Sequence, residues 1–388
     1  MAKLIDKGAT GPPWRGCAVN MITRREFTQS LGSAVVLSTL KSELRWPSDA
    51  PQVSAKAADL YRSTFVLDCN TLASIGSSEQ ELKAIRESGI TAFKSTLGGA
   101  TGTFENAKAD IAAAEELIEK RPDLFLKVRT YGDLERAQQQ RKVAVIYSFE
   151  TASMLEDKIE RIELFRNLGV RVMQLTYNRR SPFGVGCLDG DVNGLTELGR
   201  EAIVKMNQVG VALDLSHANT QTIAEGIAVS KKPPIVSHSA CRSVYMHPRN
   251  MEDREMKALA AKGGVMGIYM LPYLTPSPKQ PTLDDYMRHM EHALKICGED
   301  QVGIGTDVPF SPVTEKDFEF FRRLVEQRKA AGISAPGEDR PPYIPELNTP
   351  RRMEIVADAL LKRGYTSRVV EKVLGANFRR VFTEIWPA

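Results

Sequence analysis

The sequence is poor in cysteine, with five in 388 residues and no paired spacing. A disulfide framework is therefore not expected, although the four cysteines after residue 60 could pair in an oxidising compartment. No apolar run approaches the roughly 18 residues of a membrane-spanning helix. No block of one charge occurs either, since 52 basic and 48 acidic residues are spread along the chain. These absences argue against a disulfide-rich scaffold, a membrane-spanning protein and a nucleic-acid-binding protein.

The first 57 residues differ in character from the rest of the chain. The pair Arg24-Arg25 precedes a weakly apolar stretch, Leu31–Leu40, and then a segment rich in Ser, Pro and Ala. This order resembles a twin-arginine export signal. We therefore expect residues 1–57 to be an export signal and a disordered N-terminal segment. The protein itself is then expected to be periplasmic or secreted in a bacterium. A basic tail with no role in export is the alternative.

Eight short apolar runs, most of them separated by a helical segment, occupy the chain after residue 60. The runs are Thr64–Asn70, Gly89–Ser95, Val143–Glu150, Val170–Tyr177, Gly210–His217, Pro234–His238, Gly264–Met270 and Val302–Asp307. Strands that alternate with helices predict a parallel sheet, and eight such units predict a (β/α)8 TIM barrel. We expect residues 58–388 to form one such domain with a helical C-terminal extension, in which Ser367–Ile385 is the last helix.

Polar residues close several of these runs, and the strand ends of a barrel meet at one mouth. Glu150, His217 and His238 close the third, fifth and sixth runs. Two histidines and a carboxylate are a common ligand set for a hydrolytic zinc ion. Each histidine alone is better explained as a core residue, but both stand at strand ends in a chain with only five histidines. The pattern therefore predicts a zinc site.

Two further residues suit the chemistry of such a site. Asp307 ends the eighth run, where a carboxylate could take a proton from water and pass it to a leaving nitrogen. Arg249 follows the sixth run and could hold a substrate carboxylate with both arms of its guanidinium. The alternatives are an aspartate that caps a turn and an arginine at the surface.

Several motifs occur in the order found in one enzyme family. They are Gly194-Leu-Thr-Glu-Leu-Gly-Arg-Glu, Asp214-Leu-Ser-His, Ser237-His-Ser-Ala, His247-Pro-Arg-Asn, Gly303-Ile-Gly-Thr-Asp and Leu374-Gly-Ala-Asn-Phe-Arg-Arg-Val. From about Ala57 to the C-terminus, the chain resembles the membrane (renal) dipeptidase family, peptidase family M19. The resemblance implies a barrel related to the amidohydrolases and a two-zinc site that cleaves dipeptides, including dipeptides with a D-residue at the C-terminal side.

The resemblance also implies a role for each candidate residue. Glu150 matches the carboxylate that bridges the two zinc ions, and His217 and His238 match the ligands of the second zinc. Asp307 matches the acid/base, and Arg249 matches the residue that holds the substrate carboxylate. Members of this family are often homodimers, so a homodimer is one expectation for this chain.

The chain departs from the family pattern at two places. Cys69 and Thr71 stand where the family has a His-x-Asp pair that binds the first zinc. Cys69 could ligate as a thiolate, but threonine is a poor zinc ligand. Tyr177 stands where the family has a histidine that contacts the scissile carbonyl, and its hydroxyl could donate a similar hydrogen bond. We therefore expect one zinc ion, with a second ion only if Cys69, water or substrate completes its site.

Three interpretations follow for the function. The first is a zinc-dependent dipeptidase-type hydrolase that cleaves dipeptides or similar small carboxylate-bearing amides. The second keeps the metal but hydrolyses a different amide or a lactone. The third is an exported binding protein that has lost its chemistry. The five residues that match the family's machinery favour an enzyme, because a binding protein needs no proton shuttle.

Overall fold

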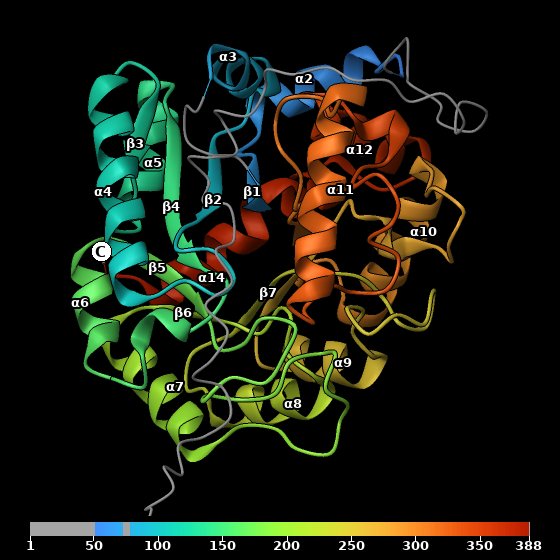
Figure 1. The fold of residues 1–388 in the computed structure, drawn as a ribbon. Helices are drawn as coiled ribbons and strands as arrows, with labels where there is room; N and C mark the ends of the chain where they lie inside the picture. The colour runs from blue at the N-terminus through green and yellow to red at the C-terminus, as the bar shows by residue number, and fades with distance from the viewer. Residues whose placement is uncertain (1–50, 73–77, 388) are drawn as a thin grey trace, which may run out of the picture.

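Eight parallel strands curve into a nearly closed barrel, as the sequence predicts (Figure 1). The computed structural model describes residues 51–72 and 78–387, so the predicted export motif lies outside the described residues. The strands in spatial order are β1 (Leu67–Thr71), β2 (Ala92–Thr96), β4 (Val143–Phe149), β5 (Val170–Gln174), β6 (Ala212–Asp214), β7 (Ile235–Ser239), β8 (Val265–Ile268) and β9 (Val302–Ile304). Backbone bonds from Asp307 N to Asn70 O (2.7 Å) and from Leu72 N to Val308 O (3.3 Å) bring the last strand beside the first.

Helices surround this barrel (Figure 1). They are α2 (Ala55–Ser63), α3 (Glu79–Ser88), α4 (Phe104–Lys120), α5 (Gly132–Gln140), α6 (Arg161–Asn167), α7 (Glu197–Val209), α8 (Thr220–Val229), α9 (Asp253–Ala261), α10 (Leu283–Cys297), α11 (Glu315–Ala330), α12 (Arg352–Lys362), α13 (Ser367–Glu371) and α14 (Asn377–Ile385). Helix α2 spans the expected boundary between residues 57 and 58. Its N-cap residue Ser54 is tied to the folded unit, because its backbone N donates to Asp358 Oδ1 of α12 at 3.1 Å.

The barrel interior is filled by residues that alternate along the strands. Leu67 and Cys69 of β1, Ala92 of β2, Ala144 and Ile146 of β4 and Ile235 of β7 all belong to one buried cluster. Phe378, Phe382 and Trp386 at the end of the chain belong to the same cluster, and Trp386 Nε1 donates to the carbonyl of Arg171 in β5 at 3.1 Å. The C-terminal helix therefore packs against the barrel at the beginning of its strands, opposite the mouth.

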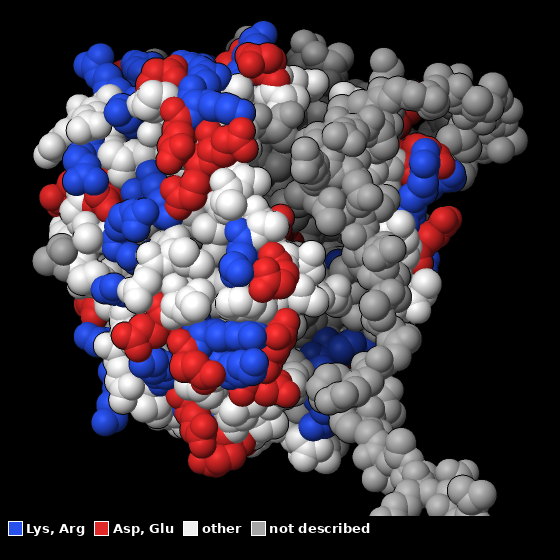
Figure 2. Space-filling model, turned by 60° about the vertical axis from the view of Figure 1, so that its left-hand side comes forward, with Lys and Arg blue, Asp and Glu red and all other residues white. Residues whose placement is uncertain are grey.

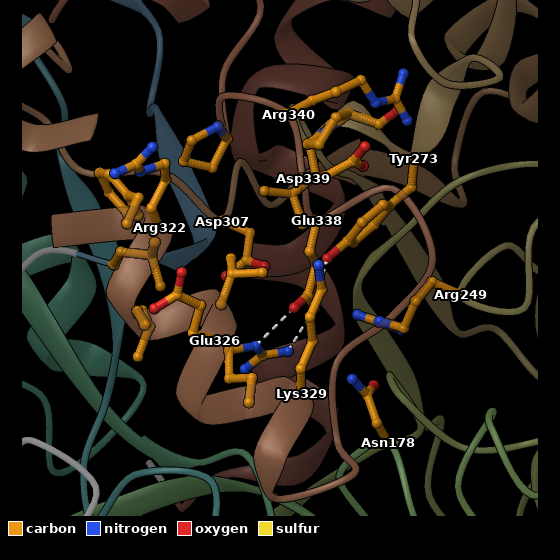
Figure 3. A pocket seen from close by; sticks show the side chains of 18 of the residues that line it. Asn178, Arg249, Tyr273, Asp307, Arg322, Glu326, Lys329, Glu338, Asp339 and Arg340 are labelled. Atoms are coloured by element: carbon orange, nitrogen blue, oxygen red, sulfur yellow. Dashed lines mark hydrogen bonds and ion pairs between the residues drawn. The ribbon is translucent and has the colours of Figure 1, made fainter. Parts of the chain in front are cut away.

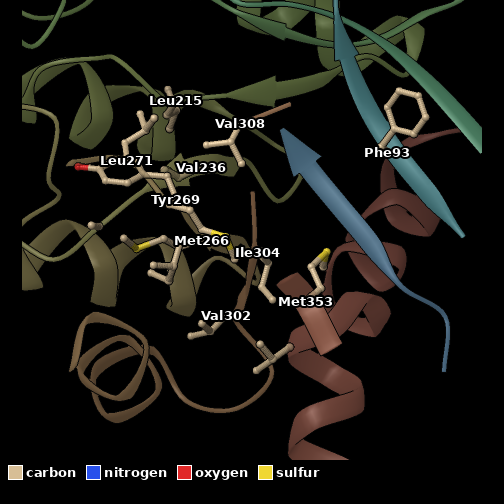
Figure 4. Packing of buried hydrophobic residues seen from close by; sticks show 14 of the residues in the cluster. Phe93, Leu215, Val236, Met266, Tyr269, Leu271, Val302, Ile304, Val308 and Met353 are labelled. Carbon is tan, nitrogen blue, oxygen red and sulfur yellow. The ribbon is translucent and has the colours of Figure 1, made fainter. Parts of the chain in front are cut away.

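A larger apolar cluster lies between the strands and the surrounding helices. Figure 4 shows some of its members, among them Phe93 of β2, Val236 of β7, Ile304 of β9 and Met353 of α12. Strand residues therefore face apolar neighbours on both sides, as expected for a parallel sheet that is covered by helices. A rigid frame of this kind fixes the strand ends and hence the residues that follow them.

The structure corrects two details of the predicted elements. A short strand that was not predicted, β3 (Phe125–Lys127), pairs in parallel with the first half of β4. The predicted final helix, Ser367–Ile385, is interrupted by a π-helical segment, Lys372–Ala376, with non-helical dihedral angles at Gly375. A Cβ atom at Gly375 would lie 2.6 Å from the carbonyl oxygen of Phe65. Glycine allows this close approach between the helical extension and the chain just before β1.

Charged side chains of both signs lie side by side over the described surface shown in Figure 2. Within residues 51–72 and 78–387, we find no helix with the length and apolar character that crossing a bilayer requires. Four cysteines in these ranges, Cys69, Cys187, Cys241 and Cys297, are buried free thiols.

Candidate metal centre and substrate pocket

Four of the predicted site residues meet at the mouth of the barrel. The ligand atoms of Glu150, His238 and Asp307 all lie within 4.8 Å of one another. His217 joins this group, because its Nε2 atom is 2.8 Å from Nε2 of His238. The residues come from the ends of four different strands, which is the arrangement of reactive groups typical of this kind of barrel.

The backbone is strained at two of these residues. His217 and Asp307 have φ angles of 66° and 59°, in the left-handed region that side chains other than glycine seldom adopt. Both residues lie in loops, since β6 ends at Asp214 and β9 ends at Ile304. The strands therefore end up to three residues earlier than predicted. Backbone strain of this kind clusters at functional sites, where the surrounding structure maintains it.

Hydrogen bonds fix the orientation of both imidazole rings. His217 Nδ1 lies 2.7 Å from Asn178 Oδ1, an oxygen that can only accept, so Nδ1 must be the donor. His238 Nδ1 lies 2.8 Å from Ser237 Oγ, and this hydroxyl in turn donates to Asp214 Oδ2. Ser237 therefore accepts from His238. In both rings the proton is on Nδ1, and Nε2 presents a lone pair to the site.

These tautomers fit a bound cation. Two Nε2 acceptors at 2.8 Å repel each other unless a proton or a metal ion lies between them. Burial, and then the charge of Arg249, lower the pKa of both His217 and His238 well below the usual value, so both rings are neutral near pH 7. A divalent metal held by the two histidines and Glu150 would satisfy both lone pairs.

Asp307 lies beside Glu150, and a single amide group joins them. Asn70 Nδ2 donates to Glu150 Oε1 at 3.0 Å and to Asp307 Oδ1 at 2.8 Å. Burial, and then the nearby charge of Glu150, raise the pKa of Asp307 well above that of an ordinary aspartate. A carboxylate with a raised pKa is suited to accepting and returning a proton near neutral pH.

Arg249 lies in the loop after β7 with 4% of its surface exposed. The Ser239 hydroxyl donates to its carbonyl at 2.9 Å, which fixes the loop against the strand end. Its Nη2 atom is buried and has no hydrogen-bond partner among the described residues. Figure 3 shows the guanidinium pointing into the pocket. An unpaired buried guanidinium nitrogen is costly, and an anionic ligand would satisfy it.

Tyr177 covers the metal-binding side of the pocket. Its ring stacks on His217 with the centroids 4.2 Å apart, and its hydroxyl accepts a hydrogen bond from Arg328 Nη1 at 2.6 Å. Arg328 of α11 also pairs with Glu338. Burial raises the pKa of Tyr177 to about 12, so the phenol keeps its proton. Its hydroxyl is therefore still able to donate one hydrogen bond to a substrate.

The pocket above these residues has a volume of about 290 Å³. Glu150, His217 and Asp307 are among its lining residues, and Phe318, Phe321 and Val325 of α11 contribute apolar surface. Figure 3 shows Arg249 and Asn178 entering from one side, and Arg322 and Glu326 of α11 from the other. Such a pocket suits a small molecule that has both a charged and an apolar end.

Cys69 and Thr71 of β1, which stand at the positions of the family's first-zinc ligands, do not direct metal-binding groups to the mouth of the barrel. The Thr71 hydroxyl donates to the carbonyl of Val308 at 2.8 Å. Cys69 is packed in the apolar barrel interior, where burial raises the pKa of its thiol well above the usual value. The role of Cys69 as a ligand stays a prediction, and its surroundings favour the neutral thiol over the thiolate that binds metal.

Sequence reasoning missed the residues that orient the site, above all Asn70, Lys94, Thr96 and Asn178. One signal was available for Lys94, because a lysine interrupts the apolar run Gly89–Ser95 at a position that faces the barrel interior. The other three also stand at or directly after the ends of apolar runs, since Asn70 closes the first run, but an amide or a hydroxyl carries no distinctive chemistry.

The chain resembles known proteins both in sequence and in structure. A family model described as membrane dipeptidase (peptidase family M19) matches residues 91–335. An uncharacterized dipeptidase of Schizosaccharomyces pombe is 31% identical over 184 residues, which are 46% of this chain and 44% of that protein. The chain thus spans less than half the length of that curated relative.

Two solved structures are similar over most of the chain. An amidohydrolase from Pseudomonas aeruginosa is 33% identical, with a TM-score of 0.76, and the match covers 85% of this chain and 99% of that one. A metallo peptidase from Rhodobacter sphaeroides, solved with a phosphinate mimic of the dipeptide L-Ala-D-Ala, is 19% identical with a TM-score of 0.67. That match covers 84% of this chain and 100% of that one, and at this identity it supports the fold alone.

Proposed function

The chain belongs to the membrane dipeptidase family, peptidase family M19, and on that premise we propose that it is a zinc-dependent hydrolase of dipeptides. One observation carries the proposal. The Nε2 acceptors of His217 and His238 face each other at 2.8 Å, and His238 lies beside the carboxylates of Glu150 and Asp307. Zinc suits this set of nitrogen and oxygen ligands. Its Lewis acidity is the chemistry that such a site needs to activate water near neutral pH.

The remaining residues would bind the substrate and move the proton. Asn70 occupies Oδ1 of Asp307, which leaves Oδ2 to take a proton from the attacking water and to pass it to the leaving nitrogen. Tyr177 would donate its hydroxyl proton in a hydrogen bond to the scissile carbonyl while Arg328 holds the phenol oxygen in place. Arg249 would bind the terminal carboxylate of the dipeptide through its unpaired Nη2 atom.

A dipeptide panel tests the proposal, and it includes L-Ala-D-Ala because the similar metallo peptidase was solved with a mimic of that dipeptide. Each substrate is assayed with purified protein, with and without added zinc, and metal content is measured in parallel. We expect zinc-dependent release of free amino acids. Absence of turnover on every dipeptide by fully zinc-loaded protein would contradict the proposal.

Arg249→Ala tests the substrate contact separately from the metal. Loss of a charge-assisted hydrogen bond costs about 1.5–3 kcal/mol, which corresponds to a KM about 10–100-fold higher. The bound zinc should not change. Arg249→Lys is the matched variant, because it keeps the charge but loses the forked geometry and should give an intermediate KM. An unchanged KM in both variants would remove Arg249 from the substrate site.

A second candidate is hydrolysis of another carboxylate-bearing amide or a lactone at the same site. The observation that favours it is the phenol of Tyr177, which is held by Arg328 at the position where the family resemblance implies an imidazole. In the panel, zinc-loaded protein that ignores dipeptides but opens a lactone or cleaves an N-acyl amino acid would support this candidate.

We also propose export through the twin-arginine route, on the sequence evidence of Arg24-Arg25 and the apolar stretch after it. Residues 1–57 fused to a reporter that is active only after export should give a signal, and replacement of both arginines by lysine should abolish it.

A further inference from the structure

Lys94 is a buried lysine beside the proposed metal centre, on the side of the barrel formed by β1 and β2. Its side chain is fully buried. Its ammonium donates to Asn70 Oδ1 at 2.7 Å and to Ser148 Oγ at 3.3 Å, and it lies 3.9 Å from Asp214 Oδ2. A buried ammonium is stable only with partners of this kind. Lys94 is therefore a fixed positive charge inside the barrel mouth.

The contact with Lys94 fixes the orientation of the Asn70 amide. Since its oxygen accepts from the ammonium, its two N–H groups point the other way. They reach one oxygen of Glu150 and one oxygen of Asp307, at 3.0 and 2.8 Å. Lys94 thus polarises an amide whose two donors bridge the two carboxylates of the site.

Oε1 of Glu150, the carboxylate oxygen nearest to Asn70 and Thr96, has no free lone pair. Glu150 Oε1 accepts from Asn70 Nδ2 and also from the Thr96 hydroxyl, at 3.0 and 2.9 Å. A carboxylate oxygen has two lone pairs, so both are used. Thr71 directs its hydroxyl to the carbonyl of Val308. The residues present on this side therefore do not fit the first zinc ion of the two-zinc site that the family resemblance implies.

We propose that the Lys94 ammonium, acting through the Asn70 amide, supplies the positive charge that a first metal ion would supply beside Glu150 and Asp307, so that the centre holds a single divalent cation at Glu150, His217 and His238. The ammonium and one divalent cation together offset the charges of Glu150, Asp307 and Asp214, which leaves the buried charge of Arg249 for an anionic ligand. Lys94 is a positioning residue, because it does not line the pocket and is not one of the proposed ligands. The inference rests on the proposed function for the role of Asp307, but the number of bound cations can be measured without any substrate.

The first experiment counts metal ions in the full chain. Purified protein is loaded with excess zinc, dialysed against zinc-free buffer and analysed by inductively coupled plasma mass spectrometry. We expect one zinc per chain. Two zinc ions per chain, or none, would overturn the inference. This result does not depend on turnover, so it separates a failure of this inference from a failure of the proposed activity.

The second experiment removes the ammonium. Lys94→Met keeps a side chain of similar length without charge. We expect it to retain one zinc, to lower kcat by about 10–100-fold, as loss of a supporting partner around a metal site does, and to leave KM within about threefold. An unchanged kcat, or loss of the zinc, would overturn the role of Lys94, because the lysine is proposed to act through Asn70 on Asp307 and on Oε1 of Glu150, and both imidazoles keep their own hydrogen-bond partners in this variant.

Two further variants keep this test decisive. Asn70→Ala removes the link between the ammonium and the carboxylates and should give the same fall in kcat, even if Lys94→Met does not fold. Lys127→Met is the matched control, because it removes a lysine of β3 that is paired with Glu115 and is not part of the mouth. Its kcat should equal that of the wild type. A normal kcat in Asn70→Ala would contradict the proposed link.

Discussion

The two sides of the barrel mouth hold positive charge in different ways. On the side of β6 and β7, His217 and His238 present two unprotonated nitrogens 2.8 Å apart, a pair that calls for an added cation. On the side of β1 and β2, the positive charge is part of the chain. The Lys94 ammonium donates to the Asn70 side-chain oxygen, and the Asn70 amide nitrogen joins Glu150 to Asp307. One side is an open set of ligands, and the other is a completed hydrogen-bond network.

On the proposed assignment, a two-metal architecture loses one ion and keeps its geometry. A carboxylate pair needs neighbouring positive charge or donors, and these can come from a metal ion, an amide or an ammonium. Glu150 lies at the junction, with Oε1 taken by the network on one side. Changes on the histidine side should therefore alter zinc binding, whereas changes on the Lys94 side should alter kcat and leave the bound zinc in place.

The largest effect should come from removing a ligand on the histidine side. His238→Ala deletes one of the two facing nitrogens, so zinc binding should be lost and kcat/KM should fall by about a thousandfold or more. Cys69→Ala on the opposite side is the matched variant, and it should keep one zinc and most of the activity. Metal analysis and steady-state kinetics check both. Full zinc content in His238→Ala would break the comparison.

A smaller effect is expected from the partner that orients His217. Asn178→Ala removes the acceptor of the Nδ1 proton, so the ring can rotate or change tautomer. Loss of such a partner typically weakens metal affinity by about 10–100-fold. Zinc titration against a competing chelator measures this change. Asn178→Asp keeps an acceptor at this position and should restore most of the affinity, whereas equal loss in both variants would argue against an orienting role.

The order of strands and helices could be predicted because each barrel strand is an apolar run bounded by a helix or a turn. Strand β3 was missed, since Phe125–Lys127 is only three residues long and lies between two helices. The break in the final helix was also missed. It depends on how closely Gly375 approaches Phe65, which is a tertiary contact and leaves no periodic pattern in the sequence.

The residues that the structure brings together at the mouth could be predicted better than the residues that support them. Glu150, His217, His238 and Asp307 carry distinctive chemistry and close apolar runs. Asn70 and Asn178 act through hydrogen bonds that depend on side-chain rotamers and on the register of several strands, and a single sequence does not fix these.

The smallest predicted effect concerns the support of the histidine side and its dependence on pH. His289 of α10 is buried, accepts the Cys241 N–H through Nδ1 at 3.1 Å and faces the Leu274 carbonyl with Nε2 at 3.1 Å. Cys241 lies three residues after His238, so this contact fixes the chain that leaves β7. Burial lowers the pKa of His289 to about 4, because the charged ring would be desolvated and would lose its accepted hydrogen bond.

An unfolded histidine binds its proton near pH 6.5, whereas folded His289 does so only near pH 4. The unfolded state therefore carries more protons between these values, and the free energy of unfolding falls as the pH falls through this window, by about 3 kcal/mol at its limit. His289→Gln can keep both hydrogen bonds without titrating, so its urea-unfolding free energy should decline less than that of the wild type between pH 6.5 and 4. His292→Gln, at a partly exposed position of the same helix where the imidazole pairs with Asp253, is the control, and its curve should keep the slope of the wild type between pH 6.5 and 4. Parallel curves for wild type and His289→Gln would show that His289 does not couple the stability of the histidine side to pH.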